Sequence, residues 1–405
     1  MADLPLNLEG VPEAVIALFT NEQRNALIAL RRDLHQHPEL AFGEERTCVA
    51  LERALSTACP VSIQRVAGTG LVARIRGGNP SAPVVAVRGD IDALPIREAT
   101  GVPYASQNDG IMHACGHDVH ASWAVGAAYL LANRPAAGDV LVVLQPAEEI
   151  GQGAAAILQS GALDDVAAIF GAHVDRRFPV GHVVVQTGSL AAAADTFSIT
   201  LTGRGAHAAR PHESADPVLG AGLLIASLQG IVSRRVDPSV PAVLTVATMQ
   251  AGSAPNVIPE TATIGGTLRS LDPQTRALLA HELRRVAHGI AAAHDLSAEV
   301  RIDLGTPPIV NPQQQVTWAR QAAVALLGEA AIVPLGITNM AGEDFAFYME
   351  RFPGAFLRIG AREPGGDATP AHTPSFLAAD GSLFIGAALL AETARVSSAS
   401  LAAQM

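Results

Sequence analysis

Three short apolar runs in the first half of the chain constrain its fold most strongly. They cover residues 83–87, 140–144 and 166–170, and alanine-rich stretches that favour helix, such as residues 121–132, lie between them. Continuous apolar runs of this length are typical of strands buried on both faces, and helical connections are typical of a parallel sheet. The sequence therefore predicts an α/β fold in which a mainly parallel open sheet is flanked by helices.

The segment before these runs has a helical pattern. It extends from about residue 12 to residue 59, and we expect a break near His37 because the following residue, Pro38, disfavours helical geometry in the residue before it. After residue 304 helix and strand patterns resume, including an apolar run at residues 355–359.

The pattern changes between residues 189 and 303. DTFSITLTG alternates apolar and polar residues, as a half-exposed antiparallel strand does, and AVLTVATMQAG and TATIGGTLRS are typical of further strands. Helical stretches at 217–233 and 273–294 and a strand at 298–303 complete a β-α-β-β-α-β order. This order predicts an inserted two-layer α+β domain at 189–303, which divides a first domain made of residues 1–188 and 304–405.

Charge and composition exclude several classes of function. The net charge is −11, and the sequence has no basic run and no interleaving of aromatic and basic residues, so we expect no nucleic-acid partner. The N-terminus lacks a signal-peptide pattern and no apolar run reaches about 18 residues, so we expect a cytoplasmic protein without a membrane partner. Three cysteines, Cys48, Cys59 and Cys115, argue against a disulfide framework and leave a ligand or a reactive thiol open.

Polar groups follow each of the three apolar runs. The first run leads into RGDID, the second into QPAEE and the third into GAHV. In open α/β sheets, functional sites form at the carboxyl ends of the strands. The sequence therefore predicts a site at this edge of the sheet.

The stretch IMHACGHDVH at residues 111–120 holds the densest group of electron-pair donors. Cys115 and His117 are separated by one glycine, which permits a tight backbone path, and thiolate and imidazole both bind zinc and similar metals. The alternative is a buried cysteine, with His113 and His120 serving only to cap the next helix. The motif alone does not decide between these interpretations.

Further donors follow the other two runs. Glu148 and Glu149 come directly after Pro146-Ala147. They could be the acidic start of a helix. Alternatively, because neighbouring residues in an extended stretch point in opposite directions, one could be a metal ligand and the other a general base. His173 taken alone is typical of a hydrogen-bonded core residue. Donors at successive strand ends together favour a metal site.

The motifs as a set resemble a known family. RGDIDALPI, MHACGHDVH, PAEE, GAHV, GRGAHAARPH, APNVIPE, GEDF and AHTPSF occur in the order found in the aminoacylase and carboxypeptidase family of dinuclear metallopeptidases. The chain resembles most closely the amidohydrolase branch that contains hippurate hydrolases and plant indole-acetyl-amino-acid hydrolases. The match extends from HQHPEL to AHTPSF, over nearly the whole chain.

The resemblance implies the roles of individual residues. Glu148 matches the catalytic carboxylate. Asp92 and Asp118 are expected to orient the metal ligands without binding metal themselves. In place of the wider family's His-x-Asp pair this chain has Asp90 and Asp92, so the division of ligands between two ions stays open. The residues that match the branch's metal ligands are Cys115, His117, Glu149, His173 and His372. The assignment of His372 depends on the resemblance alone.

The resemblance also implies a role for the inserted domain as a lid and a dimerisation domain, and hence a homodimer. His207 matches a histidine that reaches over the site in dimeric relatives and helps to bind the carbonyl oxygen. Asn256 and Arg269 lie where relatives contact substrate. The alternatives are that Asn256 only makes a turn and that Arg269 is an ordinary surface charge.

The activity implied is hydrolysis of the amide bond of N-acyl amino acids, with acetyl, benzoyl or larger acyl groups, by metal-activated water. Two divalent metal ions are the expected cofactors; zinc suits the donor set, and manganese, cobalt or nickel are alternatives. There are three alternatives. The protein could be a dipeptidase or carboxypeptidase, a non-catalytic metal-binding relative, or a hydrolase with Cys115 as nucleophile.

Overall fold

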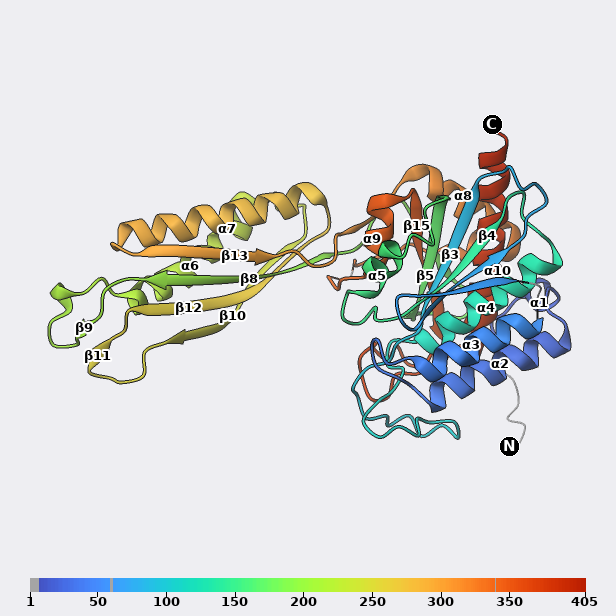
Figure 1. The fold of residues 1–405 in the computed structure, drawn as a ribbon, viewed down its shortest axis with the longest axis horizontal. Helices are drawn as coiled ribbons and strands as arrows, with labels where there is room; N and C mark the ends of the chain where they lie inside the picture. Colours follow the sequence, from blue (N-terminus) through green and yellow to red (C-terminus); the bar gives the residue numbers. More distant parts are fainter. Residues whose placement is uncertain (1–6, 59–60, 339) are drawn as a thin grey trace. The chain divides into compact units, whose positions relative to one another are not determined.

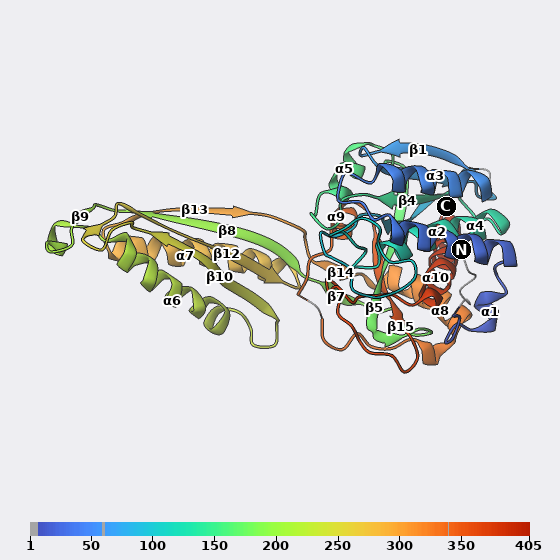
Figure 2. The same ribbon diagram turned by 90° about the horizontal axis from the view of Figure 1, so that it is seen from below.

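The computed structural model describes residues 7–58, 61–338 and 340–405, so Cys59 lies outside the described residues. The chain divides into two compact units. Unit 1 comprises the described parts of Met1–Gly188, Asn311–Ile337 and Phe347–Met405, and unit 2 comprises Ser189–Val310 with the described part of Thr338–Ala346. Figure 1 and Figure 2 label the helices and strands of both units.

The centre of unit 1 is a mixed sheet that is parallel in its middle. Among the described residues it has seven strands in the order β1-β2-β4-β3-β5-β15-β6. The four central strands, β4, β3, β5 and β15, run parallel, whereas β1, β2 and β6 pair antiparallel at the edges. The strand bounds are Ser62–Val66 (β1), Gly70–Ile75 (β2), Val84–Asp90 (β3), Val140–Gln145 (β4), Val166–Pro179 (β5), Val183–Val184 (β6) and Gly354–Arg362 (β15). The expected flanked, mainly parallel sheet is confirmed.

Burial explains why the apolar runs became central strands. Every residue of β4, VLVVLQ, is buried, as expected for a strand covered on both faces. Helices α4 (His117–Asn133) and α10 (Asp380–Ala402) pack on β3 and its neighbours; α2 (Asn21–Gln36) and α3 (Glu45–Ala58) contact α4, and α8 (Gln313–Leu327) contacts α10. The remaining elements of this part of the fold are α1 (Glu13–Ile16), α5 (Gly153–Gln159), η2 (Glu329–Ala331) and α9 (Phe345–Arg351).

Two local features differ from the sequence-based expectations. The N-terminal helical segment is interrupted after Gln36, as expected, but it is also divided before Thr20, whose side chain forms a capping box with Gln23. Strand β5 continues well beyond the apolar run 166–170, so His173 lies inside the strand rather than at its end. The cause is β15, which pairs with β5 past this point and places Arg358 opposite His173.

Unit 2 is a two-layer α+β structure with the expected β-α-β-β-α-β order. Its four-stranded antiparallel sheet has the order β10-β12-β8-β13. Asp216 and Asp272 cap the two helices, each with a proline at the first helical position. The bounds are Ala193–Thr202 (β8), Pro217–Arg235 (α6), Ala242–Ala251 (β10), Thr261–Ser270 (β12), Pro273–Ala293 (α7) and Ser297–Asp303 (β13).

Short elements complete the described chain. β9 (Ala206–His207) pairs with β11 (Val257–Ile258), β7 (Gly188–Ala191) pairs with β14 (Ile309–Asn311), and η1 covers Pro211–Glu213. Helix α6 is long and apolar enough to cross a membrane, judged by length and composition only. Its residues Leu224, Leu228 and Ile231 lie in the hydrophobic core of unit 2, and core helices pass the same test, so this is only a weak indication of a span.

Candidate metal centre and active site

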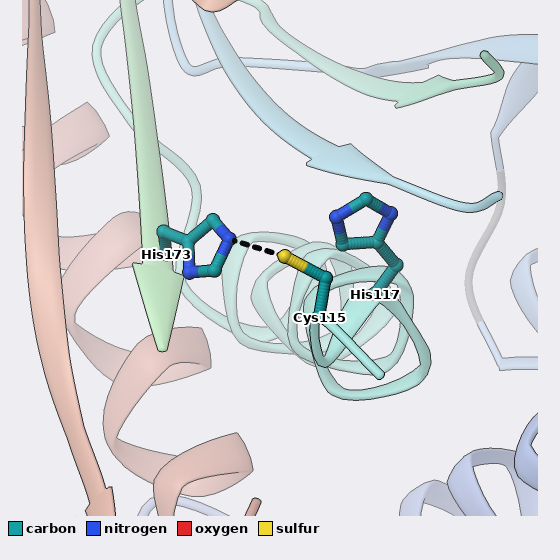
Figure 3. Close-up of side chains that lie close together, drawn as sticks. All are labelled: Cys115, His117 and His173. Carbon is teal, nitrogen blue, oxygen red and sulfur yellow. Dashed lines mark hydrogen bonds between the residues drawn. The ribbon is translucent and has the colours of Figure 1, made fainter. Parts of the chain in front are cut away.

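Cys115 and His117 lie at the start of helix α4, and Gly116 between them makes the turn. Gly116 has φ +89°, and a Cβ there would lie 2.5 Å from Cγ2 of Val174. Cys115 points toward strand β5, where its Sγ lies 3.2 Å from Nε2 of His173 (Figure 3). The ligand atoms of Cys115, His117 and His173 all lie within 4.8 Å of one another.

Hydrogen bonds fix which nitrogen of each imidazole faces the cluster. Nδ1 of His117 donates to the backbone oxygen of Asp92 at 2.9 Å and lies 3.2 Å from its Oδ1. Nδ1 of His173 donates to the backbone oxygen of Val174 at 2.7 Å. Both Nε2 atoms are therefore left for a ligand, the arrangement that metal-binding histidines generally have.

Glu148 and Glu149 lie on a turn rather than on an extended strand. Ala147 before them has φ +54°, and the backbone N–H of Glu149 donates to Oδ2 of Asp92 at 3.0 Å. As a result the two carboxylates do not point in opposite directions: oxygens of Glu148 and Glu149 lie 3.9 and 3.8 Å from Nε2 of His117. Burial raises the pKa of Glu149 to about 7.

His372 reaches the same cluster from the C-terminal part of the chain. Its Nε2 lies 3.4 Å from Oε2 of Glu149, and its backbone N–H donates to the carbonyl of Ala114 at 2.8 Å. The side chain is 55% exposed, and its backbone has φ +62°. His372, Cys115 and Glu149 form a second group of candidate ligands within 4.8 Å, so the structure brings all five expected ligands together.

The chemistry of the cluster fits bound cations. Nε2 of His117 and Oε1 of Glu149 are buried without a hydrogen-bond partner in the described part of the chain. Unpartnered buried polar atoms are costly, and a cation would satisfy both. Burial and the charge of Glu149 raise the pKa of Cys115 well above its usual range, so a bound cation would have to displace the thiol proton. Sulfur, imidazole and carboxylate together suit zinc.

Asp90 and His120 form a buried pair that the sequence did not single out as part of the site. Oδ1 of Asp90 accepts from Nδ1 of His120 at 2.6 Å, and Asp90 also pairs with Arg88. Burial alone would raise the pKa of Asp90, but Arg88 and His117 hold it well below its usual range. A signal was available in the spacing, because His120 follows His117 by three residues and so lies on the same helix face.

Asp118 joins helix α2 to the first turn of α4. Its Oδ2 accepts from Nε of Arg31 and from Nδ1 of His35, both at 2.8 Å. Nε2 of His35 lies 3.1 Å from Oε1 of Glu98, so the imidazole is held between two carboxylates. Asp118 thus fixes the start of α4 beside His117, whereas Asp92 contacts His117 directly.

The other three expected residues belong to unit 2. His207 and Asn256 are close together: His207 pairs with Val257 in the β9–β11 sheet, and the N–H of Ala208 donates to the carbonyl of Asn256. In the four-stranded sheet, the Thr202–Thr261 pair lies at one end of strands β8 and β12, and Arg269 pairs with Ala194 near the other end. The two ends are eight strand residues apart, which corresponds to roughly 27 Å. One small substrate cannot contact both ends of a single unit 2.

The fold and the site together define a hydrolase with a candidate metal centre at the edge of a parallel sheet. Residues 86–396 match the family described as Peptidase family M20/M25/M40. The chain belongs to this family, and the expected resemblance is confirmed. It is a hydrolase that acts on amide bonds in a family that includes dinuclear metal-binding peptidases.

Individual relatives agree with this assignment. The chain is 43% identical to N-acetyl-L-cysteine deacetylase of Bacillus subtilis, over 82% of this chain and 80% of the relative. It is 37% identical to IAA-amino acid hydrolase ILR1-like 5 of Arabidopsis thaliana, over 96% and 90%. The crystal structure of the Bacillus subtilis YXEP protein, a dinuclear metal-binding peptidase of the M20 family, superposes with a TM-score of 0.83 at 36% identity, covering 93% of this chain and 99% of the other.

Proposed function

We propose that this protein hydrolyses N-acyl amino acids to a carboxylic acid and a free amino acid. The observation that carries the proposal is that five metal-donor side chains form two adjoining groups, which share Cys115 and lie beside Glu148. The names of the relatives support the substrate class, because one is a deacetylase of N-acetyl-L-cysteine and another is an IAA-amino acid hydrolase. The acyl group is acetyl, benzoyl or larger; a dipeptide is the alternative substrate.

The proposed cofactors are two divalent ions, with zinc preferred and manganese, cobalt or nickel as alternatives. The ligands would be Cys115, His117, Glu149, His173 and His372. Cys115 belongs both to the group with His117 and His173 and to the group with Glu149 and His372, so these two groups of donors are contiguous. Bound ions of this kind supply Lewis acidity, which lowers the pKa of water and polarises a carbonyl.

The protein's own residues carry the proton transfers in this proposal. Glu148 takes the proton of the attacking water and returns it to the departing nitrogen, acting first as base and then as acid. Asp92 holds His117 through its backbone oxygen and carboxylate and holds the N–H of Glu149, so it orients two ligands at once. His207 would stabilise the developing oxyanion.

A cysteine nucleophile is the second candidate, since Cys115 and His173 are in contact at 3.2 Å. A nucleophilic cysteine requires a low thiol pKa, whereas burial raises the pKa of Cys115. The metal-dependent reaction is therefore favoured.

We propose that residues 189–303 act as a lid and form the interface of a homodimer. We also propose that the protein is cytoplasmic and has no membrane or nucleic-acid partner. Helix α6 exposes Val218, Leu219 and Leu223, an apolar surface that a second copy would cover. His207 and Arg269 lie at opposite ends of unit 2, so both would reach one substrate only if each came from a different copy. A change of Leu219 to Lys should shift the dimer toward monomer in sedimentation, and a change of the exposed Val49 on α3 should not.

The test of the activity is release of free amino acid from N-acetyl-, N-benzoyl- and indole-acetyl-amino acids and dipeptides. Metal-stripped protein should be inactive and should recover with zinc, manganese or cobalt. A cysteine-nucleophile enzyme would instead survive chelation and be inactivated by thiol alkylation. If no metal-loaded sample cleaves any compound, the proposed function is wrong.

A further inference from the structure

The turn that carries Glu148 has a backbone conformation that needs support. Ala147 is fully buried with φ +54°, in the left-handed region that side chains other than glycine rarely adopt. Its carbonyl accepts from the N–H of Gly153, and the carbonyl of Glu148 accepts from the N–H of Gly151. Strained backbone of this kind persists only where the surrounding structure holds it.

A carboxylate from a distant segment holds this turn at Ala147. Oε1 of Glu44 accepts the backbone N–H of Ala147 at 2.9 Å, and its Oε2 accepts the hydroxyl of Thr69 at 2.6 Å. Glu44, Thr69 and Ala147 are all buried. A hydrogen bond from a backbone N–H to a buried carboxylate is among the stronger ones, so the contact fixes the position of the turn.

The side chain of Glu44 is not needed by its own helix. Glu44 immediately precedes α3, but the free N–H groups at the start of that helix are bound by Glu39, whose two oxygens accept from Arg46 at 3.2 Å and Thr47 at 2.8 Å. The helix therefore has a cap without the carboxylate of Glu44, which is directed to the turn instead.

Two separate anchors thus hold the two glutamates. Asp92 binds the N–H of Glu149, and Glu44 binds the N–H of Ala147, next to Glu148. We infer that Glu44 is a positioning residue, which fixes the Ala147 turn and so places the carboxylate of Glu148 for proton transfer. This inference rests on the proposed function, because it takes Glu148 as the base.

Kinetics of variants separate positioning from a general structural role. Glu44→Ala should lower kcat about 10- to 100-fold, because a small misplacement of a reacting group is costly, while KM and metal content stay near the wild-type values. Glu44→Gln should recover most of kcat, since the amide oxygen can accept the Ala147 N–H and the Thr69 hydroxyl can accept from the amide. Glu39→Ala, the matched control, should lower the melting temperature and leave kcat per bound metal unchanged.

Hydrogen exchange tests the same inference without activity. The amide hydrogen of Ala147 should exchange at least about tenfold faster in Glu44→Ala and in Thr69→Val than in the wild type. In Glu39→Ala its exchange rate should be unchanged. Unchanged exchange in Glu44→Ala would overturn the anchor, and faster exchange with normal kcat would overturn its role in placing Glu148. If the wild type cleaves no N-acyl amino acid, the proposed function fails, and the exchange result still decides whether Glu44 holds the turn.

Discussion

Nε2 of His120 accepts the backbone N–H of Val174 at 3.0 Å, which ties helix α4 to strand β5 directly beside His173. The bond also fixes the tautomer, because Nδ1 of His120 must then donate to Asp90. The imidazole is fully buried and stacks on Trp123 at 4.4 Å between ring centroids. His120 is therefore a link between the element that carries Cys115 and His117 and the one that carries His173.

Replacing His120 by Ala should destabilise the protein and loosen the metal site. The change leaves a cavity, removes the partner of the Val174 N–H and removes one of the partners of the buried Asp90, so the free energy of unfolding should fall by about 2–4 kcal/mol. Affinity for zinc should fall about 10- to 100-fold, which is the typical loss when a residue that holds metal ligands in position is replaced. Urea unfolding and metal titration measure both effects; the exposed His288 changed to Ala is the control.

Replacing Glu148 by Gln should separate metal binding from turnover. The amide cannot accept a proton, so kcat should fall by about 10²- to 10⁴-fold while metal content remains normal. Glu149→Gln should instead lose metal, because a neutral amide is a much weaker metal ligand than a carboxylate. Near-normal turnover in metal-loaded Glu148→Gln would remove Glu148 from the mechanism.

The charge of His35 should make stability depend on pH. Burial lowers the pKa of His35, but Asp118 and Glu98 outweigh this effect and raise it above the usual 6.5. Because the folded-state pKa is the higher one, the stabilisation is fully present below pH 6.5 and is lost as pH rises through the folded pKa. The difference in unfolding free energy between wild type and His35→Gln should therefore shrink with rising pH. A difference that is constant between pH 5.5 and 9 would contradict a charged His35.

The energetic effect of the close approach of Gly116 to Val174 can be separated from that of the positive φ by comparing two glycine-to-alanine variants. Gly116→Ala places a Cβ 2.5 Å from Val174 in addition to the positive-φ penalty, whereas Gly110, with φ +78°, has no atom within 4 Å of a built Cβ. Gly110→Ala should cost about 1–2 kcal/mol in unfolding free energy. Gly116→Ala should cost more and should also weaken zinc binding. Equal costs for the two variants would show that the approach to Val174 does not matter.

The sequence predicted the sheet well because its central strands are buried on both faces. The run 140–144 corresponds to β4 almost residue for residue, and the six elements of the inserted region appear in the expected order. The full length of β5 was not predictable, because the polar residues after Phe170 are held in the strand by pairing with β15, which lies nearly 200 residues later in the chain.

The site was predictable to the extent that its donors lie next to apolar runs or match family motifs. The direction of Glu148 and Glu149 was not, because it depends on the positive φ of Ala147 and on the distant Glu44. The three-residue spacing from His117 indicated that His120 shares its helix face, but the bond of His120 to the Val174 N–H was not predictable, because no sequence pattern shows a backbone group. His372 was found only through the resemblance, since an isolated loop histidine carries no signal of its own.

The dependence of the cluster on His372 sets when the centre can form during synthesis. Four donors lie between residues 115 and 173, but the fifth, His372, comes from the C-terminal part of the chain and reaches them through its contact with Glu149 and through its N–H bond to Ala114. A growing chain that ends before this loop can build the inner strands of the sheet, yet it lacks one of the proposed ligands. Maturation to the fully liganded state therefore belongs to the last stage of folding, after the C-terminal strand and loop have been made.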